Sequence, residues 1–142
     1  MALHLIKLCV GGKSIDDLSN RQKKRRAERT KRSEPNETLH ITRQMPRRAT
    51  ELLDGGSLYW VIKGQITVRQ KLLEIRPVVR KGGPCCALIL SHTLVPVARR
   101  HHRPFQGWRY LKEDDAPRDL CPGEAVKLPE KLQAELSSLG LI

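Results

Sequence analysis

Aromatic residues are scarce in this sequence: Phe, Trp and Tyr together make up 4% of its 142 residues. Only five positions carry one, and all lie in two short stretches, GGSLYWVIKG at 55–64 and RPFQGWRYL at 103–111. A domain with so few large rings has little else bulky with which to fill its core. Each stretch is therefore a candidate for a core anchor or for a binding surface.

Long hydrophobic runs are also missing. No stretch approaches the about 20 apolar residues of a membrane span. The start, MALHLIKLCV, has neither a charged leader nor a small-residue cleavage pattern, so we do not interpret it as a secretion signal. We expect a cytoplasmic protein that does not associate with a membrane.

Cysteine is sparse and has no metal-binding arrangement. The four cysteines are Cys9, Cys85, Cys86 and Cys121. They form no CxxC pair, which predicts reduced and mostly buried thiols. Two of them lie in CCALIL at 85–90, the most core-like stretch of the chain, where a thiol is inert as a nucleophile.

The histidines do not suggest catalysis or metal binding either. They are His4, His40, His92, His101 and His102, and none recurs at the spacing of a closed zinc site. Residues 11–14, GGKS, resemble the end of a phosphate-binding loop, but Lys7 stands where the leading glycine is required. A plain strand-to-helix turn is the better interpretation. We expect no metal, no cofactor and no catalytic residue, although the sequence leaves an enzyme open.

Acidic residues are outnumbered, and the imbalance is regional. The chain carries 27 Lys and Arg against 15 Asp and Glu, a net charge of +12. Residues 1–103 hold +14 and residues 104–142 hold −2. A field of this size favours polyanions through long-range attraction and counterion release. The alternative is that the charge only keeps the protein soluble.

The hydrophobic periodicity predicts an α+β fold in one domain over 1–142. It places strands at 3–10, 37–45, 57–63, 66–79, 85–90, 94–97 and 107–111, and helices from Ile15, from Pro46 and over 128–140. Residues 98–104 and 112–127 are expected to be loops. The pattern indicates a strongly curved, mainly antiparallel sheet or a small β-barrel with two or three flanking helices. A glycine-first hairpin turn at Gly64-Gln65 and a bulge near 70–72 are expected within it.

A basic segment at 20–36 interrupts this pattern. Ser14 and Asp17 have the spacing of a helix N-cap, so a helix begins at Ile15. Residues 21–32, RQKKRRAERTKR, then contain eight basic residues, one acidic residue and one alanine as their only apolar residue. The segment has almost nothing to bury, and it is either a solvated extension of the helix or a disordered basic loop.

Several motifs resemble those of a known family. HLIKLCVGG, ELLDGGSLYWVIKG, RQKLLEIRP, RPFQGWRYLK and EDDAP are similar to an uncharacterised family of small alphaproteobacterial proteins, a domain of unknown function, over essentially the whole chain. That resemblance implies a cytoplasmic bacterial protein and no established activity. More loosely, a helix ending in Asp-Gly before a strand of a curved sheet resembles small PUA-like and ASCH-like barrels, which implies RNA binding.

The two aromatic stretches have basic neighbours, as in readers of single-stranded nucleic acid. Trp60 shares a strand face with Leu58 and Ile62, so we expect it in the core. Tyr59 lies on the other face with Lys63, either in the core or on a binding face. Trp108 follows a glycine in a basic region, and it either lines a pocket or the surface or is part of the core.

We therefore predict a nucleic-acid-binding accessory protein, with RNA as the favoured partner. The contact residues are expected to be Lys23, Lys24, Arg25, Arg26, Tyr59, Lys63, Arg103, Trp108 and Arg109. Two alternatives stay open: a protein-interaction module that binds an acidic partner, or a small enzyme acting on a phosphorylated or nucleotide substrate. The oligomeric state is not indicated.

Overall fold

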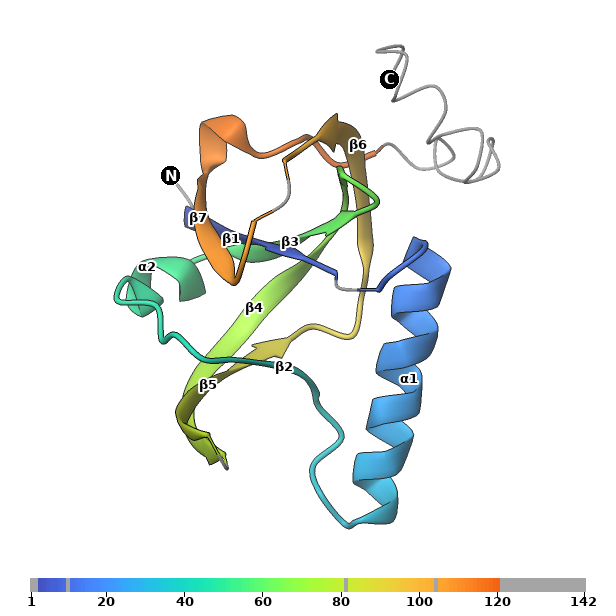
Figure 1. The fold of residues 1–142 in the computed structure, drawn as a ribbon, viewed down its shortest axis with the longest axis vertical. Helices are drawn as coiled ribbons and strands as arrows, with labels where there is room; N and C mark the ends of the chain where they lie inside the picture. The colour runs from blue at the N-terminus through green and yellow to red at the C-terminus, as the bar shows by residue number, and fades with distance from the viewer. Residues whose placement is uncertain (1–2, 10, 81, 104, 121–142) are drawn as a thin grey trace.

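One seven-stranded sheet organises the domain (Figure 1). The computed structural model describes residues 3–9, 11–80, 82–103 and 105–120. Its elements are β1 (Leu3–Leu8), α1 (Ile15–Lys31), β2 (Thr38–Thr42), α2 (Ala49–Leu53), β3 (Ser57–Ile62), β4 (Gln65–Arg80), β5 (Gly83–Leu90), β6 (Val95–His101), β7 (Trp108–Lys112) and a 3-10 helix (Glu113–Asp115). The predicted α+β class is confirmed. The helix expected over 128–140 lies outside the described residues.

The sheet is open and curled. Its strand order is β2-β5-β4-β3-β1-β7, with β6 paired to β4 beside this path. β1 and β3 are parallel, and the other described pairs are antiparallel. In the described part of the chain the end strands β2 and β7 do not pair with each other, so the sheet does not close into a barrel.

Strand β4 produces the curl. It is 16 residues long; its first half pairs with β3 and β6, and its second half pairs with β5. The register shifts between Ile66 and Val68 on the β6 side and between Leu72 and Glu74 on the β5 side. Shifts of this kind bend a strand and increase its twist. The second one lies next to the bulge predicted at 70–72.

Apolar side chains pack against both faces of the sheet. The larger cluster contains Trp60 together with Leu18 of α1 and Leu52 of α2. The smaller cluster, on the opposite face, contains Tyr59 and Val61. Successive strand residues point to opposite faces, so β3 is buried on both sides. Trp60 is 3% exposed, which confirms its predicted place in the core.

Helix α1 begins where the sequence predicts. The Ser14 hydroxyl accepts a hydrogen bond from the Asp17 amide at 3.0 Å, and the Asp17 carboxylate accepts one from the Lys13 amide at 3.1 Å. These two amides, which a phosphate loop would offer to a ligand, are already bonded. Residues 11–14 therefore form a capped strand-to-helix turn. The basic stretch continues the helix as far as Lys31.

Some local expectations are wrong. Helix α2 begins at Ala49, three residues after Pro46, where the sequence predicts its start. The β3–β4 hairpin turns at Lys63-Gly64, one residue earlier than expected, and both residues have positive φ, 51° and 77°. This is the turn class whose twist matches the flanking strands. Strand β6 also extends through Ala98 to His101, which the sequence assigns to a loop. Pairing with β4 extends the strand there despite its polar side chains.

Candidate nucleic-acid interface

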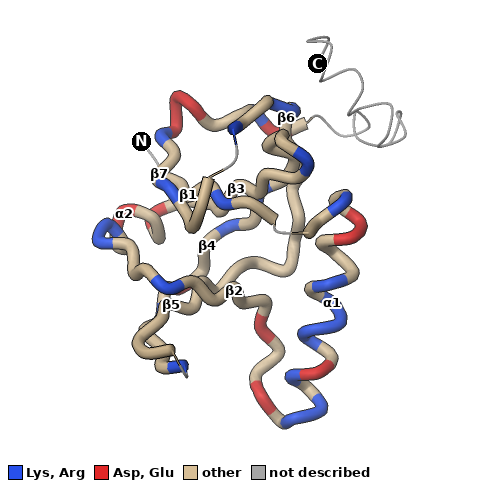
Figure 2. Tube along the Cα trace, in the orientation of Figure 1, with Lys and Arg blue, Asp and Glu red and all other residues tan. Residues whose placement is uncertain are grey.

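The four basic residues predicted on α1 occupy different environments. Figure 2 shows Lys and Arg along most of this helix. Lys23, Lys24 and Arg25 are exposed. Arg26 is half-buried, and its Nη1 donates to Thr38 Oγ1 of β2 at 2.8 Å. The first three are free to contact a polyanion, whereas Arg26 holds the helix against the sheet.

The C-terminal end of α1 is partly neutralised. Arg29 forms ion pairs with Glu34 at 2.9 Å and with Glu37 at 3.7 Å. Arg32 pairs with Glu34 at 3.0 Å. The unbalanced positive charge of the helix is therefore concentrated in the turn that carries Lys23, Lys24 and Arg25.

Trp108 lies beside a cation on the sheet. It is half-buried on β7, and its Cα partner on β1 is Lys7. The indole Nε1 donates to the carbonyl oxygen of Gln44 at 2.8 Å. Tyr110 stands edge-on to the indole at 5.0 Å between ring centroids, and the Arg48 guanidinium lies 5.6 Å from the Tyr110 ring centre. A half-buried ring with a fixed N–H, at a strand position opposed to a lysine, is suited to stacking a base near its phosphate.

Arg109 lies on the opposite face of the sheet from Trp108, and Arg103 and Lys63 lie near the β3–β4 turn. Arg109 follows Trp108 on β7 and so points to the opposite face, where its guanidinium lies 5.6 Å from the Phe105 ring centre. Arg103 and Lys63 are exposed and close in space, because the His102 amide bonds the carbonyl of Gly64 at 2.8 Å. The residues predicted as one recognition face are thus divided between two faces of the sheet.

Tyr59 is enclosed. Its side chain is 4% exposed and packs in the smaller core cluster. His4 stands edge-on to its ring at 5.1 Å between centroids. Because neither ring face is open, a base cannot stack on Tyr59 in this conformation.

The sequence prediction did not include Lys7 and His40. Both lie on the Trp108 side, the sheet face that carries Trp60 and Trp108, between Trp108 and α1. Lys7 is the Cα partner of Trp60 as well as of Trp108, and His40 stands edge-on to Trp60 at 5.1 Å. Burial lowers the pKa of Lys7. Burial, with the positive charges of Lys7 and Arg25, lowers the pKa of His40 to about 4. Lys7 interrupts an apolar strand in the sequence, and that interruption was the signal that could have identified it as a candidate site residue.

A polar pocket surrounds His4. Its volume is about 450 Å³, and Tyr59 and Arg69 line it. The His4 Nδ1 accepts from the Ser57 amide at 3.0 Å, so the ring proton is on Nε2, which donates to Glu113 at 2.6 Å. Most of the polar groups there bond one another.

The Arg69–Asp119 pair closes the same pocket. Two parallel bonds of 2.7 Å join the guanidinium to the carboxylate. Arg69 also donates to the Ser57 hydroxyl at 3.0 Å. The Arg69 bonds hold the pKa of Asp119 below its usual range. This network ties the segment after β7 to β3 and β4 and leaves few free groups for chemistry.

The two buried thiols that the structure describes, Cys9 and Cys86, show no sign of activation. Burial raises the pKa of Cys9 and of Cys86, and both are buried in the larger core cluster. Among the described residues, no group of three or more His, Cys, Asp or Glu side chains could hold a metal ion. Nor does this part of the chain contain a helix with the length and apolarity needed to cross a membrane.

Comparisons with known proteins identify a family and no closer relative. Neither the curated proteins nor the solved structures give a match. A family model matches residues 5–142, almost the whole chain. The resemblance to an uncharacterised family is thereby confirmed: this protein belongs to the family described as Protein of unknown function (DUF1489).

Proposed function

We propose that this protein binds single-stranded nucleic acid, with RNA as the favoured form. The observation that carries the proposal is the pairing of Lys7 with Trp108 on neighbouring strands, which places a half-buried lysine and a half-buried indole at opposed positions on one face of the sheet. No described carboxylate forms an ion pair with Lys7. Base stacking on such a ring contributes about 1–3 kcal/mol, and the cation attracts the adjoining phosphate.

The regional charge supports the same proposal. Lys23, Lys24 and Arg25 add an exposed cationic turn on the helix that covers the Trp60 side of the sheet. Contacts of this type supply affinity without sequence preference, because they displace condensed counterions. The indole then distinguishes strands with unstacked bases from duplexes, whose base faces are covered.

Fluorescence anisotropy tests the proposal. Labelled 12-mers of one sequence, as single-stranded RNA, single-stranded DNA and RNA duplex, are titrated with the purified protein at two salt concentrations. Binding of a single strand in preference to the duplex, with affinity that falls as salt rises, is the expected result. Absence of binding to all three at low salt, with the protein folded, would overturn the proposal.

An acidic protein partner is the main competing function, because the same helix surface would attract carboxylates. If the partner is an acidic protein, poly-glutamate should displace the RNA at equal charge concentration, and its binding should not depend on the Trp108 indole. A small enzyme acting on a phosphorylated or nucleotide substrate would have the His4 pocket as a candidate site. The mutual bonding of the polar groups there makes this the weaker alternative.

A further inference from the structure

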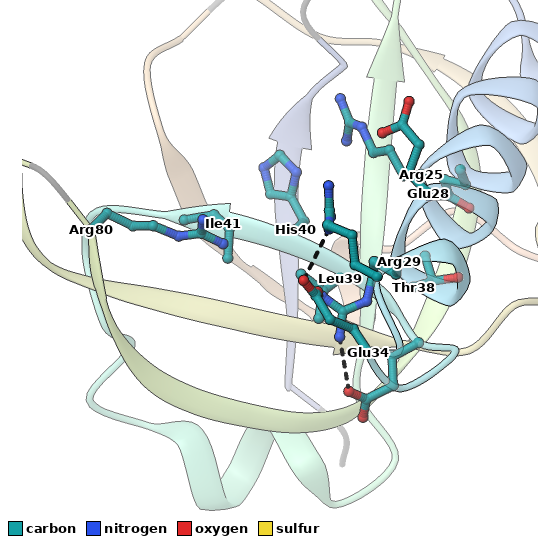
Figure 3. A pocket seen from close by; sticks show the side chains of 12 residues that line it. Arg25, Glu28, Arg29, Glu34, Thr38, Leu39, His40, Ile41 and Arg80 are labelled. Atoms are coloured by element: carbon teal, nitrogen blue, oxygen red, sulfur yellow. Dashed lines mark hydrogen bonds and ion pairs between the residues drawn. The ribbon is translucent and has the colours of Figure 1, made fainter.

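A cleft separates α1 from the edge strand β2 (Figure 3). Its volume is about 580 Å³. One wall is a face of α1 that includes Arg25 and Arg29, and the other is formed by four consecutive β2 residues, Thr38 to Ile41. Arg80, at the end of β4, also lines the cleft. The lining further includes Arg32 and three glutamates, Glu28, Glu34 and Glu37, so arginines and carboxylates border the cleft together.

Two of these arginines have no counter-ion within the described part of the chain. Arg29 and Arg32 are engaged by Glu34 and Glu37, as described above. In contrast, no carboxylate among the described residues forms an ion pair with Arg25 or with Arg80. In Figure 3 these two residues lie on either side of His40. The cleft therefore has one free cation toward each end, where an anionic chain entering it would meet them in turn.

His40 forms part of the lining between the two arginines. Its Nε2 is buried and has no hydrogen-bond partner. The imidazole is uncharged at neutral pH because burial and the charges of Lys7 and Arg25 oppose its protonation. An anion placed near Lys7 and Arg25 would offset that positive field. The ring is thus a natural reporter of anion binding.

We infer that the α1–β2 cleft is the phosphate-binding subsite of this protein, in which Arg25 and Arg80 hold separate phosphates of one single strand. This inference rests on the proposed function and adds the place where the nucleic-acid backbone binds. It also specifies that the ligand is single-stranded. Phosphates of a duplex are fixed on the outside of a stiff helix, whereas a flexible single strand can follow a groove.

The Trp108 side and the cleft lie on the same face of the sheet. Lys7 is the Cα partner of both Trp108 and Trp60, and His40, which lines the cleft, stands against Trp60. Trp60 itself is buried and belongs to the core between the two sites. Arg25, on the α1 wall of the cleft, acts through its charge on the same histidine. The exposed lysines Lys23 and Lys24 lie on the same helix and add attraction from outside it.

The test compares three double variants of the full chain by anisotropy with labelled single-stranded oligouridylate. Arg25→Gln with Arg80→Gln removes the two cleft cations. Lys71→Gln with Lys112→Gln removes two exposed charges outside the cleft and is the matched control. Lys23→Gln with Lys24→Gln serves as a positive control for the helix surface.

The cleft variant is expected to lower the salt slope of log K by about 1.4, since each lost single-strand phosphate contact removes about 0.7. The control variant should keep the wild-type slope. An unchanged slope in the cleft variant, with weakened binding in the Lys23/Lys24 variant, refutes the cleft and leaves the proposed function standing. Absence of binding by the wild-type protein refutes the proposed function itself.

NMR of the histidine rings supplies an independent readout. Titration with the dinucleotide pUpU should move the His40 signals and raise the pKa of His40, because a bound phosphate favours the imidazolium. The His92 signals should stay in place. If poly-glutamate produces the same His40 response and pUpU does not, the cleft is a peptide site and the inference is wrong. Equal affinity for duplex and single strand would also overturn it.

Discussion

Gln22 of helix α1 and Gln70 of strand β4 exchange two hydrogen bonds through their side-chain amides, at 2.8 and 2.9 Å. The Gln70 Oε1 also accepts from the indole Nε1 of Trp60 at 2.8 Å, and its Nε2 donates to the Ser91 carbonyl at 2.9 Å. Gln22 and Gln70 are buried, at 6% and 0% exposed. A basic helix with little apolar surface is thus held on the core by a fully bonded amide pair.

Replacing Gln70 with Ala should therefore destabilise the whole domain. It leaves the Trp60 N–H and the Gln22 amide buried without a partner, and each such group costs about 1–3 kcal/mol. Urea denaturation followed by tryptophan fluorescence measures the change in the free energy of unfolding. Gln106→Ala, at an exposed position, is the control and should unfold like the wild type. Equal midpoints for the two variants would show that the amide pair contributes nothing.

Gly56→Ala should destabilise the domain strongly, although it adds only one methyl group. A Cβ at this position would collide with the backbone carbonyl oxygens of Leu52 and Leu3. Neither oxygen can move without displacing α2 or β1, so we expect a loss of several kcal/mol or a failure to fold. Gly82→Ala has no atom within 4 Å of the new Cβ and is the control. Thermal melts of both variants check this, and similar melting temperatures would contradict the packing of α2 on β1.

The sequence pattern predicted the element order well because most strands alternate or are uniformly apolar. It identified the N-cap at Ser14, the burial of Trp60 and the hairpin between β3 and β4. It did not identify Gln22 as a core contact, since a glutamine within RQKKRRAERTKR carries no apolar signal. Its partner Gln70 is 48 residues away and is brought close only by the curl of β4.

The candidate interface was less predictable, because its residues are brought together by strand faces and cross-strand register and not by their order in the sequence. Trp108 and Arg109 are adjacent in sequence, but a strand sends them to opposite faces. Lys7 and Trp108 are distant in sequence, yet the β1–β7 register makes them neighbours. The cleft depends in addition on how far α1 stands from β2, which follows from the Arg26–Thr38 bond and not from any periodicity.

His40 should make the domain sensitive to acid. The pKa of His40 is about 4 in the folded protein and near 6.5 when unfolded, so between these values the unfolded state binds the extra proton. The His40 contribution to stability is therefore constant above about pH 6.5 and falls by about 1.4 kcal/mol for each pH unit below it, until pH approaches 4. Urea denaturation at pH 7, 6 and 5 measures this loss.

His40→Gln is the control for that pH dependence. The variant should lose much less stability between pH 7 and pH 5 than the wild type. The comparison stops at about pH 5, because Asp119 and Glu74, whose pKa values are held low by Arg69 and Arg76, add their own acid sensitivity at lower pH. Parallel stability curves for the two proteins would place the imidazole in water rather than in the core.

The exposed turn of α1 should supply affinity without sequence preference. Replacing Lys23 and Lys24 with Gln should weaken binding to any polyanion and lower the salt slope by up to about 0.7 per lost contact with a single strand. Folding should be unaffected, because both side chains are exposed and have no hydrogen-bond or ion-pair partner among the described residues. Arg26→Gln should differ: it removes the bond to Thr38 and is expected to lower stability. If replacing Lys23, Lys24 and Arg26 changes binding and stability alike, then Arg26 does not differ from the lysines in holding the helix against the sheet.

Trp108 should contribute to binding through its ring and to stability through its edge. Trp108→Leu removes the stacking surface and is expected to weaken single-strand binding by about 1–3 kcal/mol. The Nε1 bond to Gln44 and the packing against the larger core cluster are lost or reduced as well, so some loss of stability accompanies it. Binding alone therefore cannot separate the two roles.

Trp108→Phe separates them. Phe keeps a ring on which a base can stack, but it has no N–H to donate to Gln44, so it loses the hydrogen bond in the same way as Leu does. If the ring is the recognition element, the Phe variant binds single-stranded RNA more tightly than the Leu variant while both lose the Gln44 bond. Anisotropy and thermal melts of the two variants give both quantities. Equal loss of binding in Phe and Leu variants, following their loss of stability, would make Trp108 a structural residue and leave the cationic cleft and helix as the contact surface.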